Sequence, residues 1–116
     1  MPHNAFKRGD PNRLRTFRGV LMTLLYTATQ GEAVNVDDPN VVSADVLLTS
    51  LETLSARPAD DELRNAVNYL EQKGYVKVEW LHDGSGMFGA VRLLATGMDL
   101  VERTVSDLGV QFSQRR

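Results

Sequence analysis

The chain has 116 residues, of which 42% are hydrophobic and 24% are charged, and its formal net charge is −2. This length suits one domain, and these fractions are those of an ordinary globular protein with a single core. Cysteine is absent, which excludes disulfides and thiolate chemistry. No apolar run approaches the roughly 18 residues of a membrane span, and the N-terminus lacks the apolar core of a signal peptide. We therefore expect a cytoplasmic protein without a membrane segment.

Charge is distributed unevenly along the chain. The first 30 residues hold one acidic residue and a basic group that consists of Lys7, Arg8, Arg13, Arg15 and Arg18. Residues 31–62 hold eight acidic residues and one arginine. Because nucleic acid attracts positive charge and repels negative charge, only the basic head of the chain favours DNA as a partner.

The segment from Asp10 to Gly31 predicts a first helix. Asp10 suits the N-cap, Pro11 suits the first helical position, and Gly31 ends the helix. Apolar residues recur at spacings of three and four: Leu14, Phe17, Leu21, Leu24, Leu25 and Ala28. The three arginines of this segment fall mostly outside that stripe. Residues 1–9 are expected to form a flexible tail.

A polar connector follows, and then a second helix. The alternation in "AVNV" (residues 33–36) suits a brief edge strand, with "DDPN" as a turn. Ser43 is a good N-cap for the helix "ADVLLTSLETL". The inward positions of this helix are Leu47, Leu48, Leu51 and Leu54.

The segment "ADDELRNAVNYLEQK" (residues 59–73) predicts a third helix, with acidic residues in its first turn, where the helix dipole favours them. Its inward stripe consists of Leu63, Ala66, Val67 and Leu70. Gly74 stands where a helix ends in a left-handed residue.

A hairpin and a closing helix complete the prediction. In "YVKVEWL", Val76, Val78 and Trp80 share one face of a strand; "HDGSG" supplies the turn, and "MFGAVRLLA" returns as the second strand. Thr96 and Asp99 have the spacing of a capping box. The helix that they would begin runs to Gly109 and carries Leu100, Val101, Thr104, Val105 and Leu108. Residues 110–116 are expected to form a C-terminal tail.

This order of elements resembles the winged helix-turn-helix domain. The resemblance is carried by "DELRNAVNYLEQKGYVKVEW", similar to a recognition helix running into a wing strand, and by "RLLATGMDLVE", similar to a wing strand entering a closing helix. The span "SADVLLTSLETLSARPADDELRNAVNYLEQKGYVKVE" is also similar to small ArsR-like winged-helix proteins of Mu-like phages and prophages. The resemblance covers residues 12–108. It implies an α+β fold over residues 10–109, mainly helical, with a two-stranded β-hairpin wing and a closing helix.

The resemblance implies a transcription-regulator-like protein that binds double-stranded DNA. The third helix would enter the major groove, with Arg64 on guanine and Asn65 or Asn68 on adenine. Lys77 and Arg92 would hold the wing on the DNA backbone, and non-specific attraction would come from Arg13, Arg15 and Arg18. The other interpretation is that these side chains are solvated and the acidic residues serve the helix dipole. The rival function is a protein-interaction module whose docking surface is the acidic middle segment.

The sequence predicts no catalytic residue, no cofactor and no metal site. The glycines of "GSGMFG" lie in a hairpin turn and do not open a helix as a phosphate-binding loop does. The chain has only two histidines, His3 and His82, and no cysteine to join them in a metal site.

Association is expected through the first and last helices, as a homodimer. Met22 and Tyr26 lie beside the main stripe of the first helix, and Val110 and Phe112 follow the last one. A helix that is apolar on several sides needs a second chain to bury the apolar side that its own core leaves exposed. The alternative is that these residues complete the core of a monomer.

Overall fold

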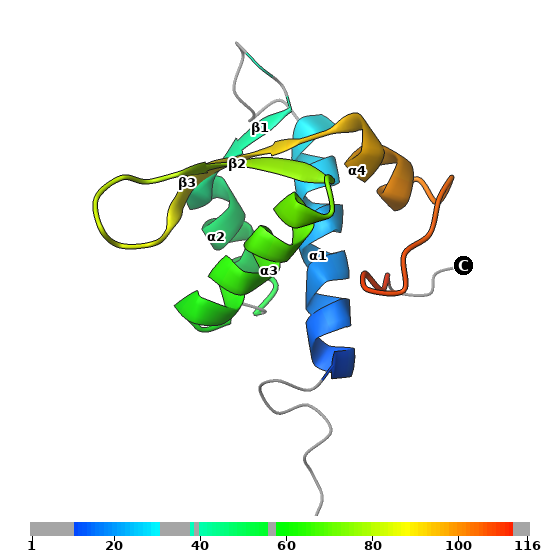
Figure 1. Ribbon diagram of the computed structural model, residues 1–116, viewed down its shortest axis with the longest axis horizontal. Coiled ribbons are helices and arrows are strands. Elements are labelled where there is room, and N and C mark those ends of the chain that lie inside the picture. Colours follow the sequence, from blue (N-terminus) through cyan, green and yellow to red (C-terminus); the bar gives the residue numbers. More distant parts are fainter. Residues whose placement is uncertain (1–10, 31–37, 39, 56–57, 113–116) are drawn as a thin grey trace, which may run out of the picture.

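The computed structural model describes residues 11–30, 38, 40–55 and 58–112. The elements follow in the order α1 (Pro11–Gln30), β1 (Val41–Ser43), α2 (Ala44–Thr53), α3 (Asp60–Gln72), β2 (Val76–Trp80), β3 (Phe88–Leu93) and α4 (Ala95–Val101) (Figure 1). The predicted α+β class and the predicted order of elements are therefore confirmed.

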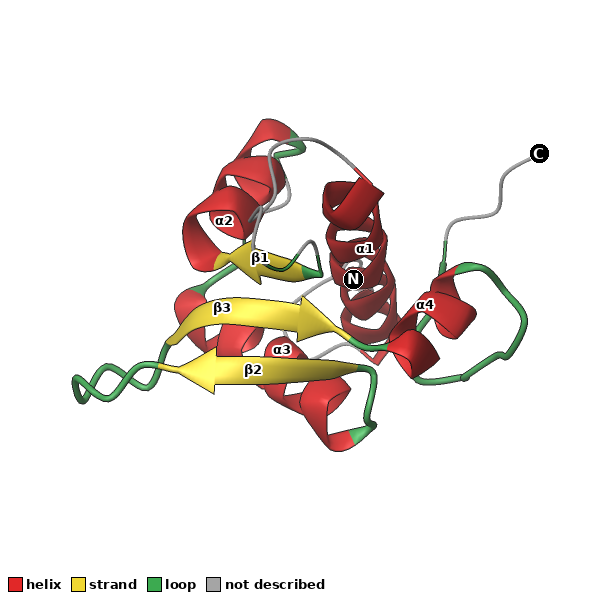
Figure 2. Ribbon diagram, turned by 90° about the horizontal axis from the view of Figure 1, so that it is seen from above, coloured by secondary structure: helices red, strands yellow, loops and turns green. Residues whose placement is uncertain are grey.

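The strands form one antiparallel sheet in the order β1-β3-β2. Val91 in the central strand β3 is paired with Val42 on one side and with Val78 on the other. Figure 1 shows α2 and α3 on one side of this sheet and α4 beyond the end of β3, and Figure 2 looks onto the opposite face of the sheet. The sheet therefore has an inner face that packs on helices and an outer face without helices.

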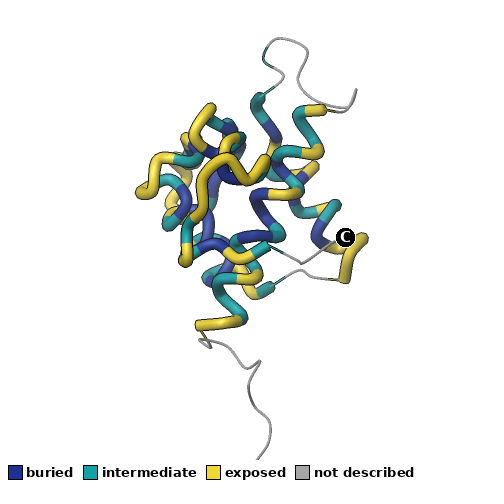
Figure 3. Tube along the Cα trace, turned by 90° about the vertical axis from the view of Figure 1, so that its right-hand side faces the viewer, coloured by how far each residue is buried: buried dark blue, intermediate teal, exposed yellow. Residues whose placement is uncertain are grey.

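The core lies between the helices and the inner face of the sheet. Leu21, Met22 and Leu25 of α1 are at most 2% exposed. All four predicted inward residues of α3 are buried, and Val76 and Val78 face inward from β2, as predicted. Buried positions gather in the middle of the molecule and exposed positions at its periphery (Figure 3). The apolar residues that recur periodically in these segments of the sequence are thus the residues that are buried in the structure.

The boundaries of α2 and α3 follow from local chemistry. The Ser43 hydroxyl accepts a hydrogen bond from the Val46 N–H at 3.2 Å, which is the predicted N-cap of α2. Gly74 has a φ of +84° after α3, and its N–H donates to the Glu71 carbonyl at 3.0 Å. The predicted left-handed end of α3 is therefore confirmed.

Two predictions about short elements need correction. The first strand lies at Val41–Ser43, and the segment 33–36 that was expected to form it lies outside the described residues. The capping box is wrong, because Leu94 occupies the N-cap of α4 and Thr96 lies inside the helix. The Thr96 hydroxyl donates to the Gly74 carbonyl at 2.5 Å. Thr96 therefore ties α4 to the end of α3 and does not cap its own helix.

The predicted fourth helix is much too long. It ends at Val101, and the N–H groups of Arg103 and Thr104 donate to the carbonyls of Leu100 and Asp99 at 3.2 and 3.0 Å. These are the two bonds of a Schellman ending, although the left-handed residue is Arg103 and not glycine. Val105 and Leu108, which were expected to lie on this helix, consequently lie beyond it, and Leu108 is 94% exposed.

The chain after α4 turns back along α1. The Gln111 N–H donates to the Arg15 carbonyl at 3.0 Å, and Val110 is only 4% exposed. A Cβ atom at Gly19 would lie 2.0 Å from the Gln111 carbonyl oxygen, so only glycine permits this close approach. The expected domain boundary at residue 109 therefore falls inside packed chain. We call residues 107–112 the C-terminal strap.

Leu54 is the remaining wrong burial prediction. It was expected to face inward from the second helix, but α2 ends at Thr53 and Leu54 is its C-cap. The side chain of Leu54 is 55% exposed. Because the chain leaves the helical path there, the period of three and four no longer directs the side chain inward.

Candidate nucleic-acid interface

The outward face of α3 carries three of the residues predicted to contact DNA. Asn65 and Asn68 are exposed, and they lie opposite the buried stripe of this helix. Arg64 is half-buried, and its Cδ and Nη1 atoms would lie 3.8 Å from a Cβ atom built at Gly86 in the hairpin turn. The structure therefore brings Arg64, Asn65 and Asn68 together, with Arg64 beside the tip of the hairpin.

Lys77 and Arg92 lie on another surface. They are directly opposite one another in the register of β2 and β3. Their neighbours Val76 and Leu93 are buried on the inner face, so Lys77 and Arg92 belong to the outer face of the sheet. Arg92 forms an ion pair with Asp38. The two predicted wing cations are thus adjacent to each other but separated by the sheet from the outward face of α3.

Arg13 is held by the start of α3. Its guanidinium makes a two-pronged contact with the Glu62 carboxylate, in which Nη2 and Oε1 are 3.0 Å apart and Nη1 contacts Oε2. Glu62 is only 8% exposed. The sequence counted Glu62 among the acidic residues that serve the helix dipole, and its burial beside Arg13 was not predicted. Much of the positive charge of Arg13 is therefore paired with Glu62 inside the protein.

Arg18 also serves an internal contact. Its guanidinium carbon lies 3.6 Å from the centre of the Tyr69 ring, and its Nη1 donates to the Gly109 carbonyl at 3.1 Å. Arg15 bonds the side chain of Asn12 at 2.9 Å. The three arginines that the sequence grouped as one basic surface consequently have three different surroundings.

Asp107 joins the C-terminal strap to the end of α3. Its carboxylate accepts hydrogen bonds from the Tyr75 hydroxyl at 2.5 Å and from the Gly109 N–H at 2.7 Å, and Lys73 lies 3.2 Å away. Burial alone would raise the pKa of Asp107, but these hydrogen bonds and the Lys73 ammonium outweigh it and lower the pKa. Burial and the hydrogen bond to Asp107 raise the pKa of Tyr75 to about 12. No sequence motif marks this network.

Glu71 covers the free edge of β2. Its two carboxylate oxygens accept hydrogen bonds from the Val78 N–H at 2.9 Å and from the Trp80 indole N–H at 3.1 Å. The Trp80 ring packs edge-on against Phe88, with ring centres 6.3 Å apart. An edge strand with open N–H groups invites pairing with another chain. Glu71 therefore satisfies one backbone N–H of this edge and fixes β2 to α3.

The charges around α3 and the hairpin are mixed. Arg64 and Lys77 have no ion-pair partner among the described residues. Acidic residues stand close to them in the chain: Asp60 and Asp61 at the start of α3, and Glu79 and Asp83 in the hairpin. Across residues 58–112, α3 and the hairpin thus carry charged residues of both signs.

The described residues contain no group of three histidine, aspartate or glutamate side chains that is close enough to hold a metal ion. None of the described helices is both long and apolar enough to cross a bilayer. No protein-family model, curated protein or solved structure matches the chain.

Proposed function

We propose that the chain is a non-enzymatic DNA-binding protein of the winged helix-turn-helix type. The observation that supports it most is the position of α3, whose outward face carries Asn65 and Asn68 while Arg64 reaches the hairpin turn at Gly86. A helix that presents amide and guanidinium groups beside a projecting hairpin suits insertion into a major groove. The order of elements and the three-stranded sheet agree with this fold.

In this proposal Asn65 and Asn68 contact adenine and Arg64 contacts guanine. Lys77 and Arg92 lie across the sheet from this face of α3, so they add only non-specific attraction for phosphates. Arg13, Arg15 and Arg18 contribute less than their number suggests, because Arg13 pairs with Glu62 and Arg18 stacks on Tyr69. Binding to random DNA is therefore weak, and discrimination between sequences depends on the outward face of α3.

The dependence of affinity on salt tests this division of roles. Each phosphate that a cation neutralises contributes a slope of about −0.9 to the logarithm of the affinity against the logarithm of the salt concentration. With no more than two cations on phosphates, we expect a slope no steeper than about −2. A much steeper slope that disappears on removal of residues 1–9 would show that the basic head holds the DNA.

The decisive experiment is fluorescence anisotropy with random duplex DNA at low salt, followed by selection of preferred sequences from a random pool. The variant Asn65→Ala/Asn68→Ala should lose sequence preference, because its amides no longer reach base edges, and Arg64→Ala should weaken binding. Gln30→Ala is the matched control, since Gln30 is an exposed amide at the far end of α1. An unchanged preference in the double variant would contradict the proposed role of α3.

The mixed charge around α3 favours one rival, a protein-interaction module with the same fold. Its docking surface would be the exposed acidic residues of α2 and the start of α3: Asp45, Glu52 and Asp60. No retention of DNA at low salt, in the chain with or without residues 1–9, would favour this rival over DNA binding.

A homodimer stays a prediction, although its first supporting residues have other roles. Met22 is fully buried in the core, the Tyr26 hydroxyl bonds Glu102 at 2.6 Å, and Val110 and Phe112 pack on the same core. Leu108 alone remains almost fully exposed among the apolar residues of the C-terminal strap. Light scattering of the full chain measures the mass directly. A two-fold dimer would place its half-sites about 34 Å apart, one turn of DNA.

A further inference from the structure

The C-terminal strap engages two cations at the end of α3. The Lys73 ammonium lies 3.2 Å from the Asp107 carboxylate, and Nη1 of Arg18 donates to the Gly109 carbonyl at 3.1 Å. The side chain of Lys73 is still 42% exposed, whereas that of Asp107 is 11% exposed. The strap therefore neutralises one cation that solvent can reach, and it occupies an N–H group of the other.

These cations share a side of α3 with a residue that is proposed to contact DNA. Asn65, Tyr69 and Lys73 follow one another at intervals of four, so they lie along one side of the helix. Both cations contact the Tyr69 ring, whose centre is 3.6 Å from the Arg18 guanidinium carbon and 5.9 Å from the Lys73 nitrogen. Without the strap, Arg18 and Lys73 would extend the outward face of α3 with positive charge.

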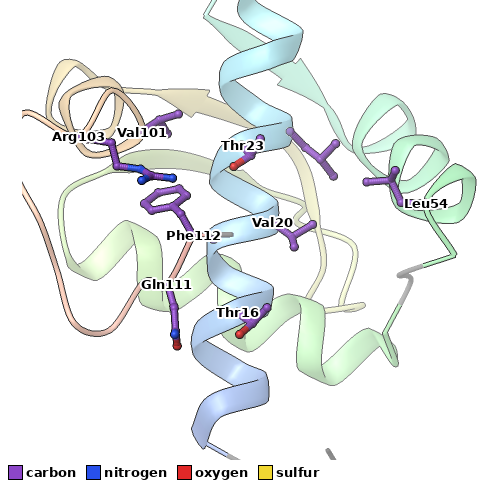
Figure 4. A pocket seen from close by; sticks show the side chains of 10 residues that line it. Thr16, Val20, Thr23, Leu54, Val101, Arg103, Gln111 and Phe112 are labelled. Carbon is purple, nitrogen blue, oxygen red and sulfur yellow. The ribbon is translucent and has the colours of Figure 1, made fainter. Parts of the chain in front are cut away.

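The strap can leave its place without breaking a helix or a strand. It contains neither, and Leu108 within it is 94% exposed. Its contacts with α1 are made by Val110, which is 4% exposed, and by the Gln111 N–H, which donates to the Arg15 carbonyl at 3.0 Å. Figure 4 shows Gln111 and Phe112 beside α1, where they line a groove. Segments with few buried contacts open at a lower free energy than the whole fold.

We propose that the C-terminal strap is an autoinhibitory contact, which competes with DNA phosphates for Arg18 and Lys73. The inference rests on the DNA binding proposed above and adds its regulation. The Asp107 carboxylate repels a phosphate from Lys73, and a phosphate on Arg18 must replace the Gly109 carbonyl. Strap closure and phosphate binding at these cations therefore oppose each other, and by linkage each weakens the other by the same factor.

The first test compares the parent chain with Gly19→Ala, whose Cβ atom forces Gln111 and the strap away from α1 without changing any charge. In fluorescence anisotropy, Gly19→Ala should bind random duplex DNA about 10-fold more tightly. Its salt slope should be steeper by about 1.8, which is about 0.9 for each freed cation. Asp107→Asn releases Lys73 without a steric clash and should give part of the same gain. Asp99→Asn, which removes an exposed carboxylate from α4, should give much less.

A second test asks whether the gain comes from a cation that the strap engages. Lys73→Ala should weaken DNA binding in the Gly19→Ala chain and change it little in the parent, where Asp107 pairs with Lys73. Lys77→Ala is the matched control, because Lys77 lies on the outer face of the sheet and should have the same effect in both chains. An equal effect of Lys73→Ala in the two chains would overturn the inference.

Hydrogen exchange of the Gln111 amide, followed by NMR, measures strap opening itself. Exchange should be faster in Gly19→Ala than in the parent, and saturating DNA should accelerate it in the parent, because binding favours the open strap. Unchanged or slower exchange with DNA would contradict the competition. Equal DNA binding by the parent and Gly19→Ala would overturn this inference alone, whereas absence of DNA binding by both would overturn it together with the proposed function.

Discussion

Gly19→Ala probes the close contact between α1 and the C-terminal strap. Within a helix, alanine is more favourable than glycine by about 1 kcal/mol, so helix propensity alone predicts a more stable protein. The added Cβ atom, however, would lie 2.0 Å from the Gln111 carbonyl oxygen and 2.7 Å from its carbonyl carbon. Both are backbone atoms, so no side-chain rotation relieves the clash, and the strap must move away from α1.

The cost follows from what that movement breaks. The Gln111 N–H would lose its bond to the Arg15 carbonyl, a loss of about 1 kcal/mol. Exposure of Val110, which is 4% exposed, would cost about 1.5 kcal/mol or more. After the gain in helix propensity, we expect Gly19→Ala to lower the free energy of unfolding by about 1–3 kcal/mol.

Urea unfolding followed by circular dichroism measures this change. Thr27→Ala, at an exposed position of the same helix, isolates the propensity effect and should stabilise the chain slightly. A chain that stops after Leu108 lacks Gln111, with which the new Cβ atom would clash. In that shortened chain Gly19→Ala should therefore become stabilising by about 1 kcal/mol. The reasoning is refuted if Gly19→Ala stabilises the full chain as much as it stabilises the shortened one.

Two further predictions concern carboxylates that the fold holds in place. Asp107→Asn should destabilise the protein at neutral pH. Folding lowers the pKa of Asp107, so its ionised carboxylate contributes to the free energy of unfolding above the unfolded pKa. That contribution is lost as the pH falls through the folded pKa. The difference in stability between Asp107→Asn and the parent should therefore shrink in acid. Urea midpoints measured across that pH range would instead show a constant difference if the network were unimportant. Glu71→Ala should cost about 1–3 kcal/mol, because two N–H donors at the β2 edge lose their acceptor. Thermal melts measure this loss, and in them the control Glu79→Ala, on the exposed face of the same strand, should stay within about 0.5 kcal/mol of the parent.

Local pattern was enough to place most of the elements. The stripe of α3, the N-cap at Ser43 and the glycine at position 74 each depend on neighbours a few residues away, and all three were confirmed. The capping box at Thr96 failed because α4 begins at Ala95, with Leu94 as its N-cap, and the Thr96 hydroxyl instead donates to the Gly74 carbonyl, 22 residues away. Spacing alone does not show at which residue a helix begins.

The roles of the charged residues were the least predictable. Arg13, Arg15 and Arg18 looked alike as a basic group in the sequence, but in the structure Arg13 pairs with Glu62 and Arg18 stacks on Tyr69. Both partners come from α3, about fifty residues further along the chain. The candidate site is therefore smaller than predicted and centres on the outward face of α3.

By itself the sequence determined the helices, the hairpin and the buried face of each, because these depend on the repeat of apolar side chains along a short stretch of chain. Only the tertiary structure decided where α4 stops, how the C-terminal strap crosses Gly19, and which charges remain directed at solvent. These features depend on contacts between residues far apart in the chain. The free energies of these long-range contacts arise only when the elements pack together, so the pattern of residues along a short stretch of chain does not contain them.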